Sequence, residues 1–150
     1  MMARMLSSLV ALLVTLTGCA LGQEAGSGSD AQTTAITFLQ VKAAPDSVKG
    51  HSVVFGGEVL TARRLKEGTR IEILQLPLDR SNRPGYDLTR SQGRFIALQR
   101  EFLDPATLPP GISVTVTGEV TGSITLPLDE TDYTYPVIDI KQLHVWAGSE

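Results

Sequence analysis

Five short segments of alternating or β-branched apolar residues, separated by turn-forming loops, constrain the fold of this chain most strongly. The clearest segment is residues 112–120, in which apolar and polar side chains alternate as they do on a half-buried strand. The loops between the segments are rich in Pro, Gly and Asp, which favour tight reversals. The other strand candidates are residues 52–60, 69–76, 93–99 and 137–146.

The predicted fold class is therefore all-β, and a small OB-like five-stranded barrel is the first choice. Closing the sheet removes exposed strand edges, which an open sheet of this size would have to protect. A β-sandwich is the second choice. Gly56 and Gly57 interrupt the first strand and suit a bulge or a tight barrel bend. Residues 33–42 could form a short helix or an extra strand, and Pro45 would end either one.

The first 19 residues follow a different pattern. Residues 6–16 form an uncharged apolar run behind Arg4, which matches the charged and apolar parts of an export signal. This run is shorter than the ~20 apolar residues that a membrane-spanning helix needs. The residues Leu16-Thr17-Gly18-Cys19 come next, and they resemble a bacterial lipobox. The resemblance implies that the signal is cut just before Cys19 and that this cysteine is acylated.

Cys19 is the single cysteine of the chain, so it cannot form an internal disulfide. An idle thiol beside an ordinary signal cleavage site is the alternative, but lipidation would consume an otherwise oxidisable group. The acyl chains on Cys19 would then hold the protein to outer-membrane lipid. Ala20 rather than Asp follows Cys19, which by the same resemblance implies the outer membrane, with the periplasmic face as the expected side.

The chain thus divides into three parts. Residues 1–18 are the predicted lipoprotein signal peptide. Residues 19–32 carry the lipidated cysteine and a tether rich in Gly and Ser, a composition that stays flexible because it cannot build a core. Residues 33–150 form the predicted barrel domain. We therefore expect a small folded domain that pivots close to a membrane surface.

Composition argues against several kinds of partner. The chain has 13 basic and 16 acidic residues, a net charge of −3 at pH 7, and no run of Lys and Arg. Nucleic acid binding needs concentrated positive charge, so we expect no nucleic acid partner. Two histidines and one cysteine are too few for a structural zinc site, and we expect no metal. We also expect no cofactor, because Gly-rich phosphate loops and dinucleotide fingerprints are missing.

Several sequence blocks together resemble the Slp family of bacterial outer-membrane lipoproteins, the starvation-inducible type. The resemblance runs from the lipobox through Trp146, and residues 126–132 depart from it by lacking a Gly-rich turn. It implies a lipoprotein linked to starvation, stationary phase or acid stress, and it supplies no catalytic residues. The blocks are Gly56-Gly57, residues 71–79, Arg83-Pro84, residues 91–95, 102–105 and 115–118, Tyr133-Thr134-Tyr135-Pro136-Val137, and residues 143–146.

Charged residues in the loops beside the middle strands are the first candidates for a ligand site. Arg83 and Arg94 lie there with Asp79 and Asp104, and all four could converge on one side of the barrel. Two guanidinium groups could hold an anionic sugar or phosphate group bidentately. The favoured alternative is that both aspartates cap turns while the arginines pair with them.

Aromatic residues supply the other candidate ligand contacts, Tyr133 and Tyr135 in particular. A stacking platform in a barrel of this type binds sugars or bases, whereas aromatic side chains more often fill the core or plug a barrel end. The complete set that could form such a platform is Tyr86, Phe95, Tyr133, Tyr135 and Trp146.

We expect no catalytic residues and therefore no enzyme. Glu58, Glu72 and Glu119 lie within strands, where facing carboxylates can act as acid and base, but a polar residue of an alternating strand usually faces solvent. The predicted function is a structural or stress-protective role in the envelope, with another envelope protein or a cell-wall glycan as the possible partner. A binding module for a cell-wall oligosaccharide or lipid headgroup is the alternative, and an envelope hydrolase is the weakest.

Overall fold

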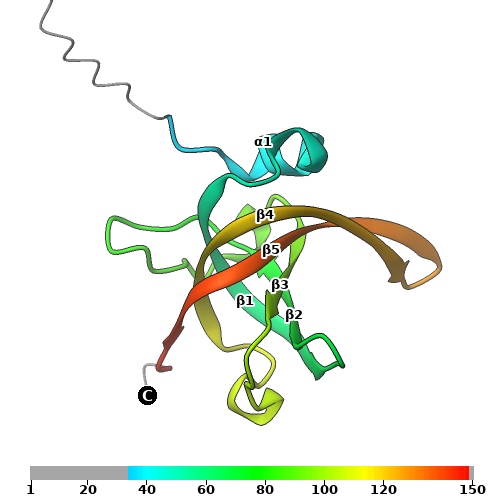
Figure 1. The fold of residues 1–150 in the computed structure, drawn as a ribbon. Coiled ribbons are helices and arrows are strands. Elements are labelled where there is room, and N and C mark those ends of the chain that lie inside the picture. The colour runs from blue at the N-terminus through cyan, green and yellow to red at the C-terminus, as the bar shows by residue number, and fades with distance from the viewer. Residues whose placement is uncertain (1–33, 149–150) are drawn as a thin grey trace, which may run out of the picture. The chain divides into compact units, whose positions relative to one another are not determined.

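The computed structural model describes residues 34–148, in which five strands close into a barrel (Figure 1). The strands are hydrogen-bonded in the ring order β1-β2-β3-β5-β4. Neighbouring strands are antiparallel except β3 and β5, which run parallel. The prediction of a small five-stranded OB-like barrel is confirmed, and the β-sandwich is wrong. The strands are β1 (Ser52–Arg64), β2 (Thr69–Gln75), β3 (Arg94–Gln99), β4 (Ser113–Leu128) and β5 (Thr131–Trp146).

Alternation of apolar residues explains why these segments close around one core. Along β2, buried and half-buried positions alternate, and Ile71 and Ile73 are fully buried. Such β-branched side chains suit a pleated surface with one buried face, and each buried one contributes roughly 1.5–3 kcal/mol. The core is completed by side chains from every strand, from the N-terminal helix and from the loop between β3 and β4. Cys19 and the predicted signal peptide and tether through residue 32 lie outside the described residues.

A short helix, α1 (Phe38–Ala43), lies over one end of the barrel (Figure 1). Thr37 begins it with a capping box, in which the Gln40 backbone N–H donates to the Thr37 hydroxyl oxygen at 3.3 Å. Phe38 and Val41 are buried in the core, and the Phe38 ring packs edge-on against Phe55 at 5.4 Å between centroids. Of the two predictions for this segment, the helix is confirmed.

Three 3₁₀ turns complete the described structure: η1 (Pro45–Val48), η2 (Leu88–Arg90) and η3 (Pro105–Thr107). Pro45 begins η1, so α1 ends before it, as expected from the missing proline N–H. Within residues 34–148, no helix has the length and apolar character needed to cross a membrane.

The glycine pair of β1 marks a close approach between strands. A Cβ atom on Gly57 would overlap the Leu74 carbonyl oxygen, and one on Gly56 would lie 2.6 Å from the Val114 oxygen. The bend prediction fits this packing, but the bulge prediction for the pair is wrong. The β1–β2 register shifts between Val59 and Thr61, so the extra residue lies beyond the glycines.

The last two strands are longer than the sequence pattern predicts, and together they form a hairpin that reaches past the barrel (Figure 1). Pairing continues out to Leu128 opposite Thr131. Asp129 takes the left-handed conformation at the turn, with φ 54°, a conformation that Asp adopts more readily than most residues. A turn can therefore form there without the glycine that the family resemblance led us to expect.

Candidate functional site

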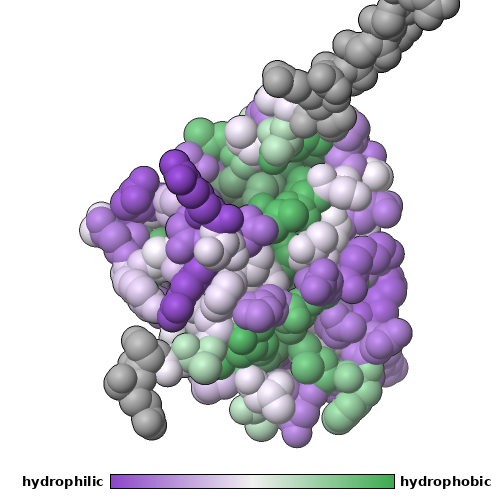
Figure 2. All heavy atoms as spheres, turned by 90° about the vertical axis from the view of Figure 1, so that its left-hand side faces the viewer, coloured by the Kyte–Doolittle hydropathy of each residue, from purple (hydrophilic) through white to green (hydrophobic). Residues whose placement is uncertain are grey.

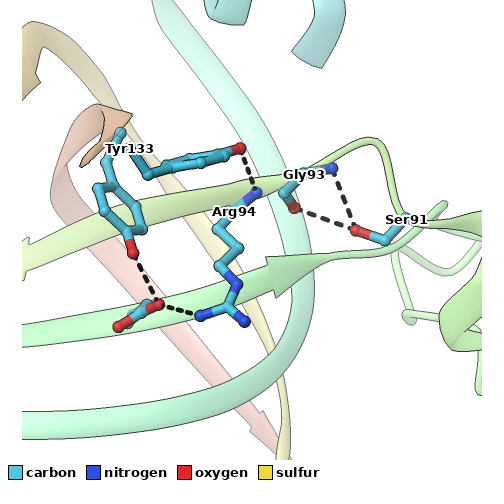
Figure 3. Close-up of polar contacts among 6 residues, drawn as sticks. Ser91, Gly93, Arg94 and Tyr133 are labelled. Carbon is cyan, nitrogen blue, oxygen red and sulfur yellow. Dashed lines mark hydrogen bonds and ion pairs between the residues drawn. The ribbon is translucent and has the colours of Figure 1, made fainter. Parts of the chain in front are cut away.

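The first cluster of predicted site residues lies on the outside of the barrel, at the base of the β4–β5 hairpin. Nη1 of Arg94, at the start of β3, lies 2.6 Å from Oε1 of Glu72 on β2. The Tyr135 hydroxyl of β5 donates to the same carboxylate oxygen at 3.1 Å. The Tyr133 hydroxyl accepts the backbone N–H of Arg94 at 3.1 Å (Figure 3). The structure therefore brings together Arg94, Tyr133 and Tyr135.

The chain just before Arg94 makes room for these contacts. Gly93 has φ +137°, and a Cβ atom on it would lie 2.6 Å from the Tyr133 hydroxyl oxygen. The Ser91 hydroxyl donates to the Gly93 carbonyl at 3.0 Å and accepts its N–H at 3.1 Å, which fixes the turn (Figure 3). Lys42 of α1 donates to the Gln92 carbonyl at 2.9 Å. The loop end, the helix and the hairpin thus hold one another in place.

The Glu72 carboxylate changes the pKa of both side chains that contact it, Tyr135 and Arg94. Tyr135 is only 1% exposed, and its burial, followed by its hydrogen bond to Glu72 and the charge of Glu72, raises the pKa of the Tyr135 hydroxyl. Burial works to lower the pKa of Arg94, but the hydrogen bond to Glu72 and its charge outweigh it, so the pKa of Arg94 is raised. Glu72 is committed to both partners, and this arrangement braces the hairpin against the barrel.

Arg83 belongs to a different cluster, on the loop between β2 and β3. Its guanidinium carbon lies 5.8 Å from the centre of the Tyr86 ring and 5.4 Å from that of Trp146 at the end of β5. Nη2 of Arg83 donates to the Tyr86 hydroxyl at 2.7 Å. Nε of Arg83 is buried without a hydrogen-bond partner among residues 34–148. Tyr86 is 68% exposed, so this arginine lies beside an open aromatic ring.

A hydrogen-bond relay fixes Trp146 against this loop. The Trp146 indole N–H donates to the Thr115 hydroxyl at 2.9 Å, and that hydroxyl donates to the Asn82 carbonyl at 2.6 Å. His144 packs on the indole with 4.2 Å between ring centroids. Trp146 lines two grooves, one of about 270 Å³ that His144 also lines, and one of about 200 Å³ that Arg83 and Tyr86 also line. On the side of the domain that carries this loop, polar side chains flank a band of apolar surface (Figure 2).

The two aspartates act as predicted on their turns but not toward the arginine side chains. One carboxylate oxygen of Asp79 accepts the backbone N–H groups of Ser81 and Arg83, at 2.7 and 3.0 Å. Asp104 accepts the Ala106 N–H at 2.9 Å at the start of η3. The turn-capping prediction is confirmed. The predicted pairing with the arginines is wrong, because Arg94 pairs with Glu72 while Arg83 lies against aromatic rings.

The five aromatic residues do not form one platform. Phe95 is fully buried in the core, and Tyr133 and Tyr135 belong to the Arg94 cluster, which leaves Tyr86 and Trp146 beside Arg83. The contacts of Glu72 with Arg94 and Tyr135 were not predicted, because the strand pattern indicated that Glu72 faces solvent. Its place opposite Ile96 on β3, two residues from Arg94, depends on the β2–β3 register. Among residues 34–148, no group of three or more His, Cys, Asp or Glu could hold a metal ion.

This chain is similar to two proteins over most of its length. It is 33% identical over 131 residues to the uncharacterized lipoprotein YeaY of Escherichia coli (strain K12), covering 87% of this chain and 66% of that relative. It is 31% identical over 98 residues to an uncharacterized protein of Haemophilus influenzae (strain ATCC 51907 / DSM 11121 / KW20 / Rd), covering 65% and 53%. The chain thus matches about two thirds and about half of these relatives' lengths.

Among solved structures, the small single-stranded DNA-binding protein from Streptomyces coelicolor aligns with a TM-score of 0.40 at 19% identity, over 64% of this chain and 94% of that one. The family model described as the outer membrane lipoprotein Slp family matches residues 16–150. This match begins at the first residue of the lipobox and continues through all five strands of the barrel. The chain belongs to the Slp family of outer membrane lipoproteins.

Proposed function

We propose that this protein is held to the periplasmic face of the outer membrane by acyl chains on Cys19 and has a non-catalytic structural or stress-protective role. The observation that carries the proposal is that the family match begins at Leu16, so it includes Leu16-Thr17-Gly18-Cys19 together with the barrel. Each buried methylene of an acyl chain contributes ~0.8 kcal/mol, so several chains give a durable anchor. The partner is another envelope protein or a cell-wall glycan.

The roles of four acidic side chains support a non-catalytic barrel. Glu72 is bound by Arg94 and Tyr135, and Asp139 is bound by Arg100 at 3.0 Å. Asp79 and Asp104 accept backbone N–H groups in turns. Carboxylates engaged in this way stabilise the fold, whereas a general acid or base needs access to a reacting group.

Fatty-acid labelling with fractionation tests the anchor. Cells that make the wild-type chain should incorporate a labelled fatty acid into it and hold it in the outer membrane. Cys19→Ser should lose both the label and the membrane association, because no other residue offers that thiol. Labelling that persists in Cys19→Ser contradicts the anchor. Survival of a deletion strain through starvation and acid challenge tests the role, and survival equal to wild type contradicts it.

The Arg83 cluster favours a second candidate, a binding module for a cell-wall oligosaccharide. Tyr86 offers an exposed ring, and Trp146 lines the groove beside it with Glu58 and Arg83. Sugar rings stack on aromatic faces, while guanidinium groups bind sugar carboxylates. An arginine beside an exposed aromatic ring in a concave surface is the arrangement that such a site requires, and the Arg83 cluster has it.

The emission of Trp146 offers a direct test, since it is the only tryptophan of the chain. Titration with soluble peptidoglycan fragments should change this emission and saturate. Arg83→Gln should weaken the response, whereas Arg80→Gln, an exposed arginine of the same loop, should not. Equal responses from both variants, or none from the wild type, would remove this candidate.

A further inference from the structure

A separate groove of about 250 Å³ lies on the outer face of the barrel, beside the β4–β5 hairpin. Arg63 of β1 and Arg70 of β2 line one part of it. The other walls include Ile96, Leu126 and Tyr135, of which Ile96 is 3% and Tyr135 1% exposed. The groove therefore joins two cationic groups to an apolar wall.

The two arginines are direct cross-strand partners in the antiparallel β1–β2 pair. Directly opposite residues point to the same face of a sheet, so the two guanidinium groups stand side by side on the outer face. Like charges in this position destabilise the pair. Neither arginine has a hydrogen bond or ion pair within the part of the chain that the structure describes. This repulsion has no compensating carboxylate there.

The acidic side chain that lines this groove already has other partners. Glu72 lines the groove, but its Oε1 is already bound by Arg94 and by the Tyr135 hydroxyl. Three arginines therefore stand against one carboxylate, in a chain whose net charge is −3. Positive charge concentrated in a groove of an acidic protein attracts an anion from solvent.

The sequence alone does not show that these two charges share a face. Arg63 and Arg70 lie at the two ends of a segment that also contains Arg64, Lys66 and Glu67, and the β1–β2 turn separates them. Only the strand register, which pairs Ala62 with Ile71 inside the barrel, places the two arginines opposite each other outside it.

We propose that this groove binds a phosphate ester, with Arg63 and Arg70 as the residues that hold it. Each guanidinium offers a fork of N–H donors that binds two oxygens of an anion at once. A phosphate group has enough oxygens to engage both forks. The apolar wall of Ile96, Leu126 and Tyr135 covers the group that carries the phosphate. All residues that line the site belong to the strands of the folded domain, so the site does not depend on a lipid at Cys19.

Thermal unfolding of the full chain in phosphatidylcholine liposomes, followed by Trp146 emission, tests the site. Inorganic phosphate should raise the unfolding midpoint above that in sodium chloride of equal ionic strength, because it binds only the folded state. Arg63→Gln and Arg70→Gln should each weaken the apparent affinity by about tenfold. Arg80→Gln removes the same charge outside the groove and should keep the wild-type response. The proposal is overturned if phosphate does not change the unfolding midpoint of the wild type, or if Arg80→Gln weakens the apparent affinity for phosphate as much as the two groove substitutions do.

A second readout separates ligand binding from a structural role. Without phosphate, Arg70→Gln should unfold at a higher temperature than the wild type, because the substitution relieves repulsion from Arg63. A structural role predicts a lower midpoint, and that result would contradict the site. Arg70→Lys keeps the charge but loses the planar fork, so it should weaken phosphate binding while remaining folded.

Liposome composition distinguishes the two sources of the phosphate. If a lipid headgroup is the natural occupant, phosphatidylglycerol in the liposomes should fill the groove and abolish the response to added phosphate. If the ligand is a free phosphate ester, the response should be equal with and without phosphatidylglycerol. Both results require Arg63 and Arg70, and a response that survives in Arg63→Gln and Arg70→Gln contradicts the proposal in either form.

Discussion

The two arginine and tyrosine clusters of this barrel use the same residue types for different purposes. Arg94 has a carboxylate partner, Glu72, and the tyrosine that shares this carboxylate is 1% exposed. Arg83 has no ion pair among residues 34–148, and its tyrosine partner is 68% exposed. One cluster is closed under the hairpin, and the other is open on a loop.

This difference separates a structural contact from a binding surface. In the Arg94 cluster the guanidinium already has a carboxylate partner that it shares with Tyr135, and a ligand would have to compete with this ion pair to enter. In the Arg83 cluster the guanidinium lies against ring faces, which leaves donors for a ligand. We therefore expect substitutions in the first cluster to change stability and those in the second to change binding.

The largest expected effect comes from Tyr135→Ala. It removes a fully buried aromatic ring and the hydrogen bond to Glu72, so the free energy of unfolding should fall by about 3–5 kcal/mol. Tyr86→Ala is the matched control, and at its exposed position the loss should stay within about 0.5 kcal/mol. Urea unfolding measures both. Equal losses would mean that the two clusters do not differ as proposed.

Glu72→Gln should have the next largest effect, because it leaves the half-buried Arg94 guanidinium without its countercharge. The expected loss in unfolding free energy is about 1–2 kcal/mol. A double-mutant cycle with Arg94→Gln should give a coupling of about 1 kcal/mol. The exposed pair Lys49–Asp46, at 56% and 75% side-chain exposure, is the control and should couple by less than about 0.5 kcal/mol. If the coupling in the Glu72–Arg94 pair were no larger than that in the Lys49–Asp46 pair, this would count against a structural role of the Glu72–Arg94 contact.

Alkaline pH should weaken the closed cluster selectively. The raised pKa of Tyr135 means that its protonated form is favoured in the folded state. Its contribution to stability is complete below the unfolded pKa of about 10 and is lost as the pH rises through the folded pKa. Urea midpoints measured at rising pH should fall less steeply for Tyr135→Phe than for the wild type, while Tyr86→Phe should keep the wild-type slope. An unchanged slope in Tyr135→Phe would exclude this coupling.

The barrel could be predicted from sequence because its inward positions repeat locally. Ile71 and Ile73 alternate with polar neighbours within one segment, so no distant contact is needed to recognise the strand. The outer hairpin was missed because Pro127 and the lack of a glycine argue against a strand. The part of β4 that extends past the barrel pairs only with β5, so its other edge is unpaired and tolerates Pro127.

The division of the site residues could not be predicted in the same way. Whether Arg94 meets Asp104 or Glu72 depends on the register of β2 against β3, and no local pattern records that register. The place of Arg83 depends on the path of its loop and on a relay from Asn82 through Thr115 to Trp146, residues far apart in the sequence. Local patterns predicted the candidates, and long-range pairing decided their partners.

Arg83→Gln should have the smallest effect on stability and a clear effect on the loop surface. Cation–π contacts at exposed sites contribute about 0.5–1 kcal/mol, so the unfolding free energy should fall by no more than that. The emission of Trp146 should change, because the guanidinium 5.4 Å from its ring is gone, and Arg80→Gln should leave it unaltered. A loss as large as that of Glu72→Gln would place Arg83 among the structural residues. A small loss of unfolding free energy together with altered Trp146 emission would support the assignment of Arg83 to an open surface that can bind a ligand.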